Sequence, residues 1–301
     1  MKRYAAIICM IIITHVNAQL PKVSNGSIQR FENFRSNYIQ NRNVDVWLPN
    51  NYNPSTKYAV LYMHDGQMLF DSSITWNKQE WKVDETMSKL IEENKIIPTI
   101  VVGIWNSGTT RHADYFPEKP IAYLPKQVKD TLIDRELLGK ARANNYLKFI
   151  VQELKPFIDS SFSTFKDAKN TFIAGSSMGG LISWYAISEY PTVFSGAACL
   201  STHWVGSIKE KSGAIPKAFV TYAKEKLPNP NNHKIYFDYG TITLDSLYEP
   251  HQKAIDRVMQ TKGYRKNKNW ITKAFKGEPH TEIAWANRLY IPLPFLLQKK
   301  P

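Results

Sequence analysis

Cysteine is scarce in this sequence, with only Cys9 and Cys199 among 301 residues. Cys9 lies in an N-terminal segment that we expect to be removed, which leaves Cys199 alone. A single thiol cannot form an internal disulfide, so the fold must depend on its hydrophobic core. The chain is long enough for such a core, since 43% of its residues are hydrophobic and 8 Trp and 16 Tyr are present.

Long hydrophobic runs are also absent. The longest, Ala5 to Ile13, is too short to span a bilayer, so we expect no stable membrane insertion. This run follows the basic pair Lys2-Arg3 and precedes Val16-Asn17-Ala18, a pattern typical of a secretory signal peptide. We predict that residues 1–18 are this signal peptide and that residues 19–301 are exported, to the periplasm or the medium.

Acidic residues are few, because 26 Asp and Glu stand against 39 Lys and Arg and the formal net charge is +13. The basic residues are scattered, and their densest cluster, Lys262 to Lys268, is short. No nucleic-acid-binding motif accompanies them, so we expect a solvated basic surface and no nucleic-acid partner. Attraction of an acidic polysaccharide or an anionic ester to this surface stays open.

Metal-binding signatures are missing as well. The chain has no H-E-x-x-H sequence and no closely spaced set of Cys and His residues. The pair formed by His112 and Asp114 is too weak a signal by itself. We therefore expect neither a metal nor another cofactor.

What the sequence does contain is an alternation of strand-like and helix-like segments. The predicted strands are Val44–Leu48, Tyr58–Met63, Ile100–Ile104, Thr171–Ala174, Gly196–Leu200, Lys234–Phe237 and Trp270–Phe275. Apolar residues at helical spacing predict helices over Trp81–Glu93 and Tyr146–Ile158, with Pro156 bending or loosening the last turn of the second. The alternation predicts an α/β fold of three layers around a mainly parallel sheet.

The most specific motif is Gly175-Ser176-Ser177-Met178-Gly179, a G-x-S-x-G sequence. A strand-like segment precedes it, and a helix-like segment, Leu181–Ile187, follows it. This strand–turn–helix context is that of the nucleophile elbow of α/β-hydrolases. The glycines let the strand and the helix approach closely, which lifts the Ser177 hydroxyl above the sheet edge. We therefore predict Ser177 as a catalytic nucleophile.

A serine nucleophile needs a base and an orienting acid, which follow it along the chain in this fold. His280 lies in a loop just beyond the last predicted strand, where a base must be to reach the serine. Asp245 follows the strand that begins at Lys234 and is our choice of acid. Asp238 and Glu249 are alternatives to Asp245 that the residue pattern leaves open.

The fold supplies the oxyanion hole from two backbone amides. One belongs to the residue after the nucleophile, Met178. The other comes from the loop His64-Asp65-Gly66-Gln67-Met68, which follows the buried strand Tyr58–Met63. We assign it to Gln67, with Met68 as the alternative, and we expect His64 to be structural.

Four further residues are predicted to line the substrate pocket. Arg111 and Tyr115 follow a predicted strand, and Arg111 could hold an anionic group or form an ion pair with Asp114 or another nearby carboxylate. His203 and Trp204 follow another strand and are predicted as pocket wall.

The rest of the chain shows no internal repeat, low-complexity tract or long linker, so we predict one domain over residues 19–301. Residues 116–142 have a Pro-rich start and weak periodicity. We interpret this segment as an insertion over the active site, a candidate lid or substrate wall.

Taken together, the motifs resemble those of the putative-esterase family of α/β-hydrolases, which includes esterase D (S-formylglutathione hydrolase), feruloyl and acetyl-xylan esterases, enterochelin esterases and mycolyltransferases. The resemblance extends from about Ser27 to Leu296. The segments that carry it are Tyr62–Asp71, Trp81–Glu85, Val102–Ile104, Arg111–Pro117, Glu153–Asp159, Ala174–Leu181, Gly240-Thr241 and His280 with Trp285.

The resemblance implies an α/β-hydrolase fold with Ser177 as nucleophile and His280 as general base. This chain departs from the family at the acid. Relatives often place a carboxylate two or three residues after the glycine of the Gly-Thr turn, where this sequence has Ile242 and Thr243. Asp245 is therefore a shifted assignment, and some family members work with a Ser–His pair alone.

The sequence thus predicts an exported serine esterase that cleaves a small-molecule or carbohydrate ester through an acyl-enzyme. The alternatives are a siderophore esterase of the enterochelin type and an acyltransferase that uses the same serine. A peptidase and a non-enzymatic binding protein on the same scaffold are less favoured, since the elbow, the nucleophile and the base are all present.

Overall fold

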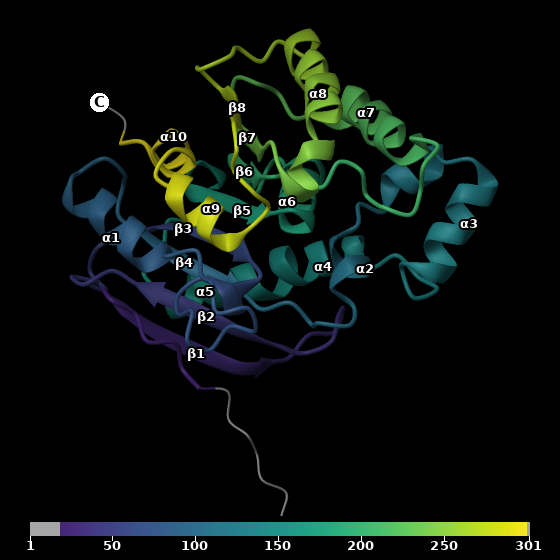
Figure 1. Cartoon of the computed structure of the whole chain (residues 1–301). Coiled ribbons are helices and arrows are strands. Elements are labelled where there is room, and N and C mark those ends of the chain that lie inside the picture. Colours follow the sequence, from purple (N-terminus) through teal and green to yellow (C-terminus); the bar gives the residue numbers. More distant parts are fainter. Residues whose placement is uncertain (1–18, 300–301) are drawn as a thin grey trace, which may run out of the picture.

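The computed structural model describes residues 19–299, so the predicted signal peptide lies outside the described residues. The chain forms one eight-stranded sheet with helices on both faces (Figure 1). The strands are β1 (Ser27–Phe34), β2 (Arg42–Leu48), β3 (Ala59–His64), β4 (Thr99–Ile104), β5 (Thr171–Ser176), β6 (Gly196–Leu200), β7 (Lys234–Gly240) and β8 (Trp270–Phe275).

The strand order is β1-β2-β4-β3-β5-β6-β7-β8. Strands β3 to β8 run parallel, and β1 and β2 pair antiparallel at one edge. The predicted α/β-hydrolase fold with a mainly parallel sheet is confirmed. In such sheets the loops at the carboxyl ends of the parallel strands gather on one side, which is where a site is expected.

Helices cover both faces of the sheet. The α-helices are α1 (Val83–Glu92), α2 (Arg111–Tyr115), α3 (Lys126–Arg135), α4 (Ala143–Lys148), α5 (Lys155–Ser161), α6 (Met178–Glu189), α7 (Ala214–Lys226), α8 (Glu249–Thr261), α9 (Glu282–Arg288) and α10 (Pro292–Leu297). Short 3-10 turns are η1 (Gly66–Met68), η2 (Lys119–Tyr123), η4 (Ala168–Asn170) and η5 (Thr243–Leu247), and η3 (Phe149–Leu154) is a π-helical segment.

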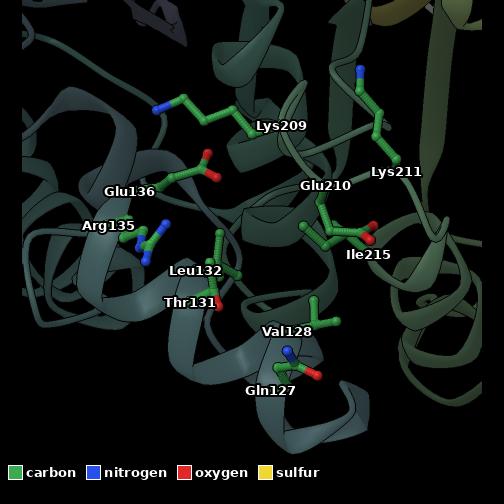
Figure 2. A pocket seen from close by; sticks show the side chains of 10 residues that line it. All are labelled: Gln127, Val128, Thr131, Leu132, Arg135, Glu136, Lys209, Glu210, Lys211 and Ile215. Carbon is green, nitrogen blue, oxygen red and sulfur yellow. The ribbon is translucent and has the colours of Figure 1, made fainter.

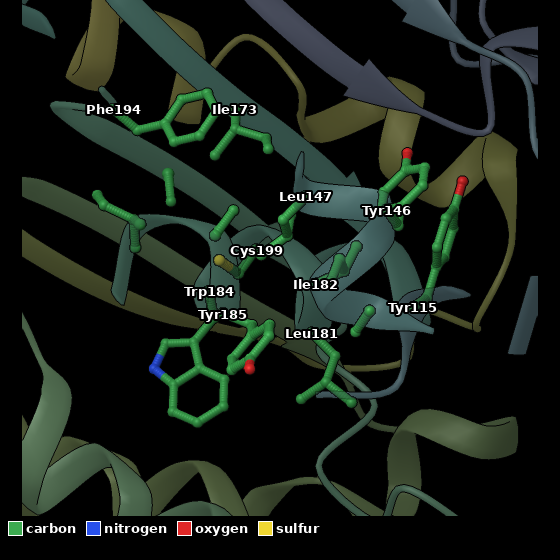
Figure 3. Close-up of a cluster of buried hydrophobic side chains, with 14 of the residues drawn as sticks. Tyr115, Tyr146, Leu147, Ile173, Leu181, Ile182, Trp184, Tyr185, Phe194 and Cys199 are labelled. Carbon is green, nitrogen blue, oxygen red and sulfur yellow. The ribbon is translucent and has the colours of Figure 1, made fainter. Parts of the chain in front are cut away.

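The core has two parts, because alternate residues of the central strands face opposite sides of the sheet. In β3, Val60 and Tyr62 pack into the larger cluster, whereas Leu61 and Met63 pack into the smaller one. The larger cluster includes side chains of α6, such as Ile182 and Trp184, and Cys199 belongs to the same cluster (Figure 3). Burial raises the pKa of the Cys199 thiol well above its usual value, so this cysteine is a packing residue.

Every predicted strand is observed, and one observed strand was not predicted. The bounds of β6 and β8 are those predicted, whereas β1 was not predicted at all. β1 is an edge strand in which exposed and half-buried residues are mixed, so it lacks the apolar run that marks a central strand. It is held by Phe31 and Phe34, whose rings pack edge to face on Phe157.

The predicted helix over Tyr146–Ile158 is continuous but irregular before Pro156, not after it. α4 leads into the π-helical segment η3, and α5 then carries Pro156 in its first turn and continues to Ser161. Proline has no N–H to donate to the preceding turn, so the irregularity belongs on its N-terminal side. The prediction that Pro156 loosens the last turn was wrong.

Residues 116–142 form η2, α3 and their connections. Tyr123 donates a hydrogen bond to Glu225 of α7, and α3 lies toward the rim of the molecule (Figure 1). A hollow of about 330 Å³ lies between α3 and the segment before α7, with Leu132 and Ile215 among its lining residues (Figure 2). The interpretation of this segment as an insertion that acts as a lid or wall stays a prediction.

Along residues 19–299, no helix combines the length and the apolar character needed to span a membrane.

Candidate active site

Ser177 sits at a sharp turn between β5 and α6, with φ 55° and ψ −121°. A non-glycine residue in this region is strained, which is typical of a nucleophile elbow. The turn requires small neighbours, because a Cβ on Gly175 would lie 2.7 Å from the carbonyl carbon of Gly179. Ser177 itself is half-buried and lies directly after the carboxyl end of β5.

His280 and Asp245 are brought together although they are 35 residues apart. His280 Nδ1 lies 2.5 Å from Asp245 Oδ1. The imidazole is also fixed by ring packing, since Trp285 of α9 meets it edge to face with centroids 4.9 Å apart. One ring nitrogen is thus occupied by a carboxylate, which leaves Nε2 for a reacting group.

Three donors hold the buried Asp245 carboxylate. Besides His280, the Ser201 hydroxyl and the Gly240 amide each donate to Oδ2 at 2.5 Å. The Ser201 hydroxyl in turn accepts hydrogen bonds from Trp285 Nε1 at 2.9 Å and from Arg288 Nη2 at 2.8 Å. The hydroxyl therefore points its own proton at Asp245.

These contacts determine the charge of Asp245. Burial alone would raise its pKa, but the hydrogen bonds from His280 and Ser201, the charge of His280 and the Gly240 amide outweigh burial and hold the pKa below its usual value. The carboxylate is therefore ionised at neutral pH. An ionised carboxylate on Nδ1 holds the imidazole in the tautomer whose Nε2 can accept a proton.

The structure also explains how Asp245 reaches this position five residues after Gly240. The turn η5 carries Thr243 at φ 54° and folds Asp245 back onto the Gly240 amide. The Thr243 hydroxyl accepts a hydrogen bond from the His280 amide at 2.9 Å, which ties the two loops together. The shifted carboxylate thus lies beside the histidine.

The two alternative acids have other partners. Asp238 is buried and binds Arg288, with Nη2 at 2.8 Å from Oδ1. Glu249 is exposed and pairs with Lys253 one turn along α8. Asp245 is thus the carboxylate of the three that contacts His280.

Tyr248 is a neighbour that the sequence analysis missed. It is fully buried, its hydroxyl lies 2.7 Å from His203 Nδ1, and a side-chain hydrogen bond links it to Ser177. Its ring also packs edge to face on His280, with centroids 5.9 Å apart. Tyr248 therefore contacts both predicted reacting residues. The sequence could have indicated Tyr248 by its position, one helical turn after the predicted acid Asp245.

The predicted oxyanion loop follows β3 directly. The Met68 amide donates to Asp65 O at 2.8 Å and is therefore occupied. The Gln67 amide donates to no backbone carbonyl in the turns, loops and helix caps of residues 19–299. The same holds for the Met178 amide, which lies at the N-terminus of α6. Of the two amides considered in this loop, Gln67 is thus the one available to a ligand.

Two of the predicted pocket residues are core residues instead. The exposed fractions of Tyr115 and Trp204 are 0% and 1%. Tyr115 belongs to the buried cluster in Figure 3, and Trp204 Nε1 donates to Gln252 while its ring packs on Trp184. Their prediction as substrate contacts was wrong, because residues after a strand can turn inward under a helix as readily as outward.

The other two predicted pocket residues lie closer to the site. His203 donates its backbone amide to Ser177 O at 3.1 Å, and burial lowers the pKa of its ring to about 3, so the ring is neutral. Arg111 forms a two-pronged ion pair with Asp65, not with Asp114, which pairs with Arg42. The alternative of a structural ion pair with a nearby carboxylate is confirmed, with Asp65 as the partner.

His64 is buried, as expected for a structural residue. Its Nδ1 lies 2.7 Å from the Tyr146 hydroxyl. Burial lowers the pKa of the ring to about 3, although the charge of Asp65 opposes this shift. The imidazole therefore stays neutral beneath the elbow.

A second hollow, of about 360 Å³, borders the predicted oxyanion loop. Its lining residues are Gln19, Gln67, Ile74, Thr75, Trp76 and Trp105. Trp76 is 83% exposed, which is costly for so large an apolar side chain unless something covers it. Trp105 is fixed by its Nε1, which donates to Asp45 at 2.8 Å. The sequence analysis missed both indoles, because single Trp residues in loops form no pattern.

Among residues 19–299, no group of three or more His, Cys, Asp and Glu side chains is arranged to hold a metal ion.

Comparison with known proteins places this chain in a family. The model of the family described as "Putative esterase" matches residues 36–289. This chain belongs to that family. The esterase is a carboxylic ester hydrolase, and the predicted resemblance is confirmed.

Individual relatives of the esterase are distant. It is 23% identical over 222 residues to the uncharacterized protein YjcH of Bacillus subtilis. The aligned region covers 73% of this chain and 75% of that protein. A ferulic acid esterase from Anaeromyces mucronatus, solved in complex with ferulic acid, superimposes with a TM-score of 0.61 at 16% identity over 92% of both chains. The enterobactin esterase FES of Shigella flexneri gives a TM-score of 0.63 at 17% identity over 93% of this chain and 60% of that one. These two structural likenesses establish the fold.

Proposed function

We propose that this esterase is a serine esterase in which Ser177 is the nucleophile, His280 the general base and Asp245 the orienting acid. The contact between His280 and the ionised Asp245 carries the proposal. In this mechanism His280 Nε2 takes the Ser177 proton as the oxygen attacks the ester carbonyl. His280 then protonates the departing alcohol and activates the water that hydrolyses the acyl-enzyme.

The Gln67 and Met178 amides are proposed to stabilise the tetrahedral oxyanion. Both are free of the backbone bonds described above, and Met178 opens the helix whose N-terminal partial charge favours an anion. Removal of one such donor in other serine hydrolases costs about 10²- to 10³-fold in kcat.

A carbohydrate ester is the substrate that we propose, with one ring of it packed in the hollow beside Gln67. Trp76 offers an exposed flat apolar ring there, of a kind that stacks on sugar rings and on aromatic acyl groups, and Trp105, whose ring also carries the Arg30 guanidinium at 4.6 Å, lines the same hollow. The ferulic acid esterase of known structure binds an aromatic acid. A siderophore ester is the second candidate, supported by the enterobactin esterase of known structure and by the net charge of +13.

Export is proposed from the N-terminal pattern of the sequence, with cleavage after Ala18. The chain from Gln19 onward then carries the whole catalytic arrangement described above, since Ser177, Asp245 and His280 all lie beyond it. Sequencing the N-terminus of the protein recovered from the periplasm or medium checks the cleavage site.

Covalent labelling tests the proposed nucleophile. The mature protein is treated with a fluorophosphonate and analysed by intact mass and peptide mapping, beside Ser177→Ala and His280→Ala. We expect one adduct on Ser177 of the wild type, none in Ser177→Ala and at least 100-fold slower labelling in His280→Ala, since general-base catalysis contributes about 10²- to 10⁴-fold.

A well-folded wild-type protein that takes up no label would overturn the serine-esterase mechanism. Once labelling is established, kcat/KM for acetylated sugar, feruloylated sugar and siderophore esters ranks the proposed substrates. The largest value for the siderophore ester would replace the carbohydrate proposal with the second candidate.

A further inference from the structure

Asp65 occupies an unusual backbone position between β3 and the Gln67 amide. Its φ is 56° and its ψ is 46°, in the left-handed region that costs a non-glycine residue about 1 kcal/mol or more. Such a conformation persists only when the surroundings hold it. The residue that follows, Gly66, leads directly into Gln67, so the conformation of Asp65 sets the direction of the Gln67 amide.

The surroundings that hold Asp65 come from the segment after β4. Arg111 donates Nε to Oδ1 at 2.7 Å and Nη2 to Oδ2 at 2.8 Å, and Asn106 donates Nδ2 to Oδ1 at 2.7 Å. The Asn106 backbone amide also donates to Gln67 Oε1 at 3.2 Å. The segment after β4 therefore forms hydrogen bonds with both Asp65 and the side chain of Gln67.

The same carboxylate lies against the nucleophile elbow. A Cβ built on Gly179 would lie 3.4 Å from Asp65 Oδ2, so the carboxylate packs on the first turn of α6 beside Met178. Asp65 thus touches both segments that supply the proposed oxyanion donors. A two-pronged arginine–carboxylate pair is rigid as well as strong, which suits it to fixing a distance between two loops.

We propose that Asp65, Arg111 and Asn106 are positioning residues that hold the Gln67 and Met178 amides at the spacing the oxyanion requires. This inference rests on the proposed function. Oxyanion donors stabilise the transition state only when they lie about 2.7–3.1 Å from the position of the oxyanion, so a small shift of the loop weakens catalysis. The trio acts through the amides and not on the substrate.

The charge state of the pair supports this role. Burial alone would raise the pKa of Asp65, but the charge of Arg111 and the hydrogen bonds from Arg111 and Asn106 outweigh it and hold the pKa below its usual value. The ion pair is therefore intact at neutral pH, where an esterase of this kind would work.

A positioning role and a substrate-binding role for Arg111 predict different kinetics. If Arg111 held an anionic group of the substrate, its loss would raise KM for anionic esters and spare neutral ones. If Arg111 positions the oxyanion donors, its loss lowers kcat for every ester, neutral esters included, and leaves KM almost unchanged. A neutral ester therefore separates the two roles.

The test uses Arg111→Gln, Asp65→Asn and Asn106→Ala with p-nitrophenyl acetate as substrate and a trifluoromethyl ketone as a tetrahedral inhibitor. We expect kcat to fall about 10- to 100-fold in the first two variants and less in Asn106→Ala, with KM within about twofold of wild type. Inhibitor affinity should fall in proportion to kcat/KM, because the inhibitor forms the same oxyanion.

The control variant is Lys155→Gln, which breaks a partly buried ion pair of similar length with Asp159 on α5. It should lower the melting temperature and leave kcat and inhibitor affinity unchanged. Arg111→Gln with a lowered melting temperature but wild-type kcat would make the Asp65 pair merely structural. A higher KM at unchanged kcat would make Arg111 a substrate-binding residue. Either outcome overturns the proposal.

Asn106→Ala keeps the test decisive if the two charge variants fail to fold, because it removes one neutral donor to Asp65. Wild-type kcat and inhibitor affinity in this variant would then contradict the proposal. Failure of the proposed function has a separate signature, which is a folded wild type without a fluorophosphonate adduct on Ser177. A labelled wild type with unaffected variants refutes the positioning role alone.

Discussion

At the scale of single residues, the site depends on competition for hydrogen bonds. Asp245 accepts from His280, Ser201 and Gly240, whereas Asp238 is only a few residues away in sequence and binds Arg288 instead. Both carboxylates are buried, so each needs donors to stay ionised. Ser201 contacts both carboxylates, through its hydroxyl to Asp245 and its amide to Asp238, and Asp245 is the one that contacts His280.

Replacement of Asp245 tests its proposed role as the orienting acid. We expect Asp245→Asn to lower kcat by roughly 10³- to 10⁴-fold, because a neutral amide holds the imidazole in the wrong tautomer and cannot stabilise its charged form. The measurement is steady-state hydrolysis of p-nitrophenyl acetate, with circular dichroism to check the fold.

Glu249→Gln is the matched control, since Glu249 was an alternative acid and its carboxylate is exposed and paired with Lys253. It should retain wild-type kcat. If Asp245→Asn kept kcat within about tenfold of wild type, a Ser–His pair would suffice and the orienting role of Asp245 would be wrong.

At the scale of structural elements, the site depends on the two loops that follow β7 and β8. A Cβ on Gly240 would lie 2.1 Å from Glu278 O, so these loops cross in direct backbone contact. The Thr241 amide donates to the same carbonyl at 3.1 Å. Asp245 comes from one loop and His280 from the other, and this crossing sets their separation.

Gly240→Ala should separate the loops. We expect it to lower the free energy of unfolding by about 2–4 kcal/mol, within the range for a backbone clash at a buried position, and to lower kcat as well. Urea denaturation followed by tryptophan fluorescence measures the first effect, and ester hydrolysis measures the second.

Gly139→Ala provides the comparison for this variant. Gly139 has a φ of 76°, and among the described residues no atom beyond its chain neighbours lies within 4 Å of where an added Cβ would stand. Only backbone strain of about 1 kcal/mol is therefore expected there. Equal losses of stability in the two variants would show that the contact with Glu278 does not matter.

At the scale of the whole molecule, carboxylates also tie the N-terminal segment to the body. Asp84 of α1 accepts hydrogen bonds from the Ser24 and Asn25 amides, at 2.7 and 3.3 Å, and Glu85 accepts from the Ser24 hydroxyl. Burial, together with the hydrogen bond and the charge of Glu85, raises the pKa of Asp84 to about 7. Two adjacent carboxyl groups thus share a proton at neutral pH.

This raised pKa predicts that stability falls as the pH rises. The folded protein keeps the Asp84 proton up to about pH 7, whereas the unfolded chain releases it near pH 4. Unfolding therefore releases a proton between these values, so the Asp84 contribution to the free energy of unfolding decreases across this window and levels off above pH 7. Urea denaturation at pH 5 and pH 8 measures the difference.

Asp84→Asn isolates this contribution, because the amide oxygen can still accept from Ser24 and the group no longer titrates. The variant should lose less stability than wild type between pH 5 and pH 8. An identical decrease in both proteins would assign the pH dependence to other groups.

Much of the fold followed from local patterns, whereas parts of the site did not. The buried strands β3 to β7 were predicted because both faces of each are largely apolar, and β1 was missed because its edge position leaves it half exposed. Trp76 was missed for a different reason. It lies in a loop and borders the hollow beside Gln67 together with residues distant in sequence, so no spacing near it indicates a role.

The sequence by itself determined the α/β fold, the elbow around Ser177 and the loop positions of Asp245 and His280, because hydrophobic periodicity and turn chemistry act over a few residues. Only the tertiary structure decided that Asp245 contacts His280, that Arg111 pairs with Asp65 and that Trp204 is buried. The reason is physical. A charged or aromatic side chain takes whichever partner the assembled fold brings within reach, and that choice is made across the whole molecule.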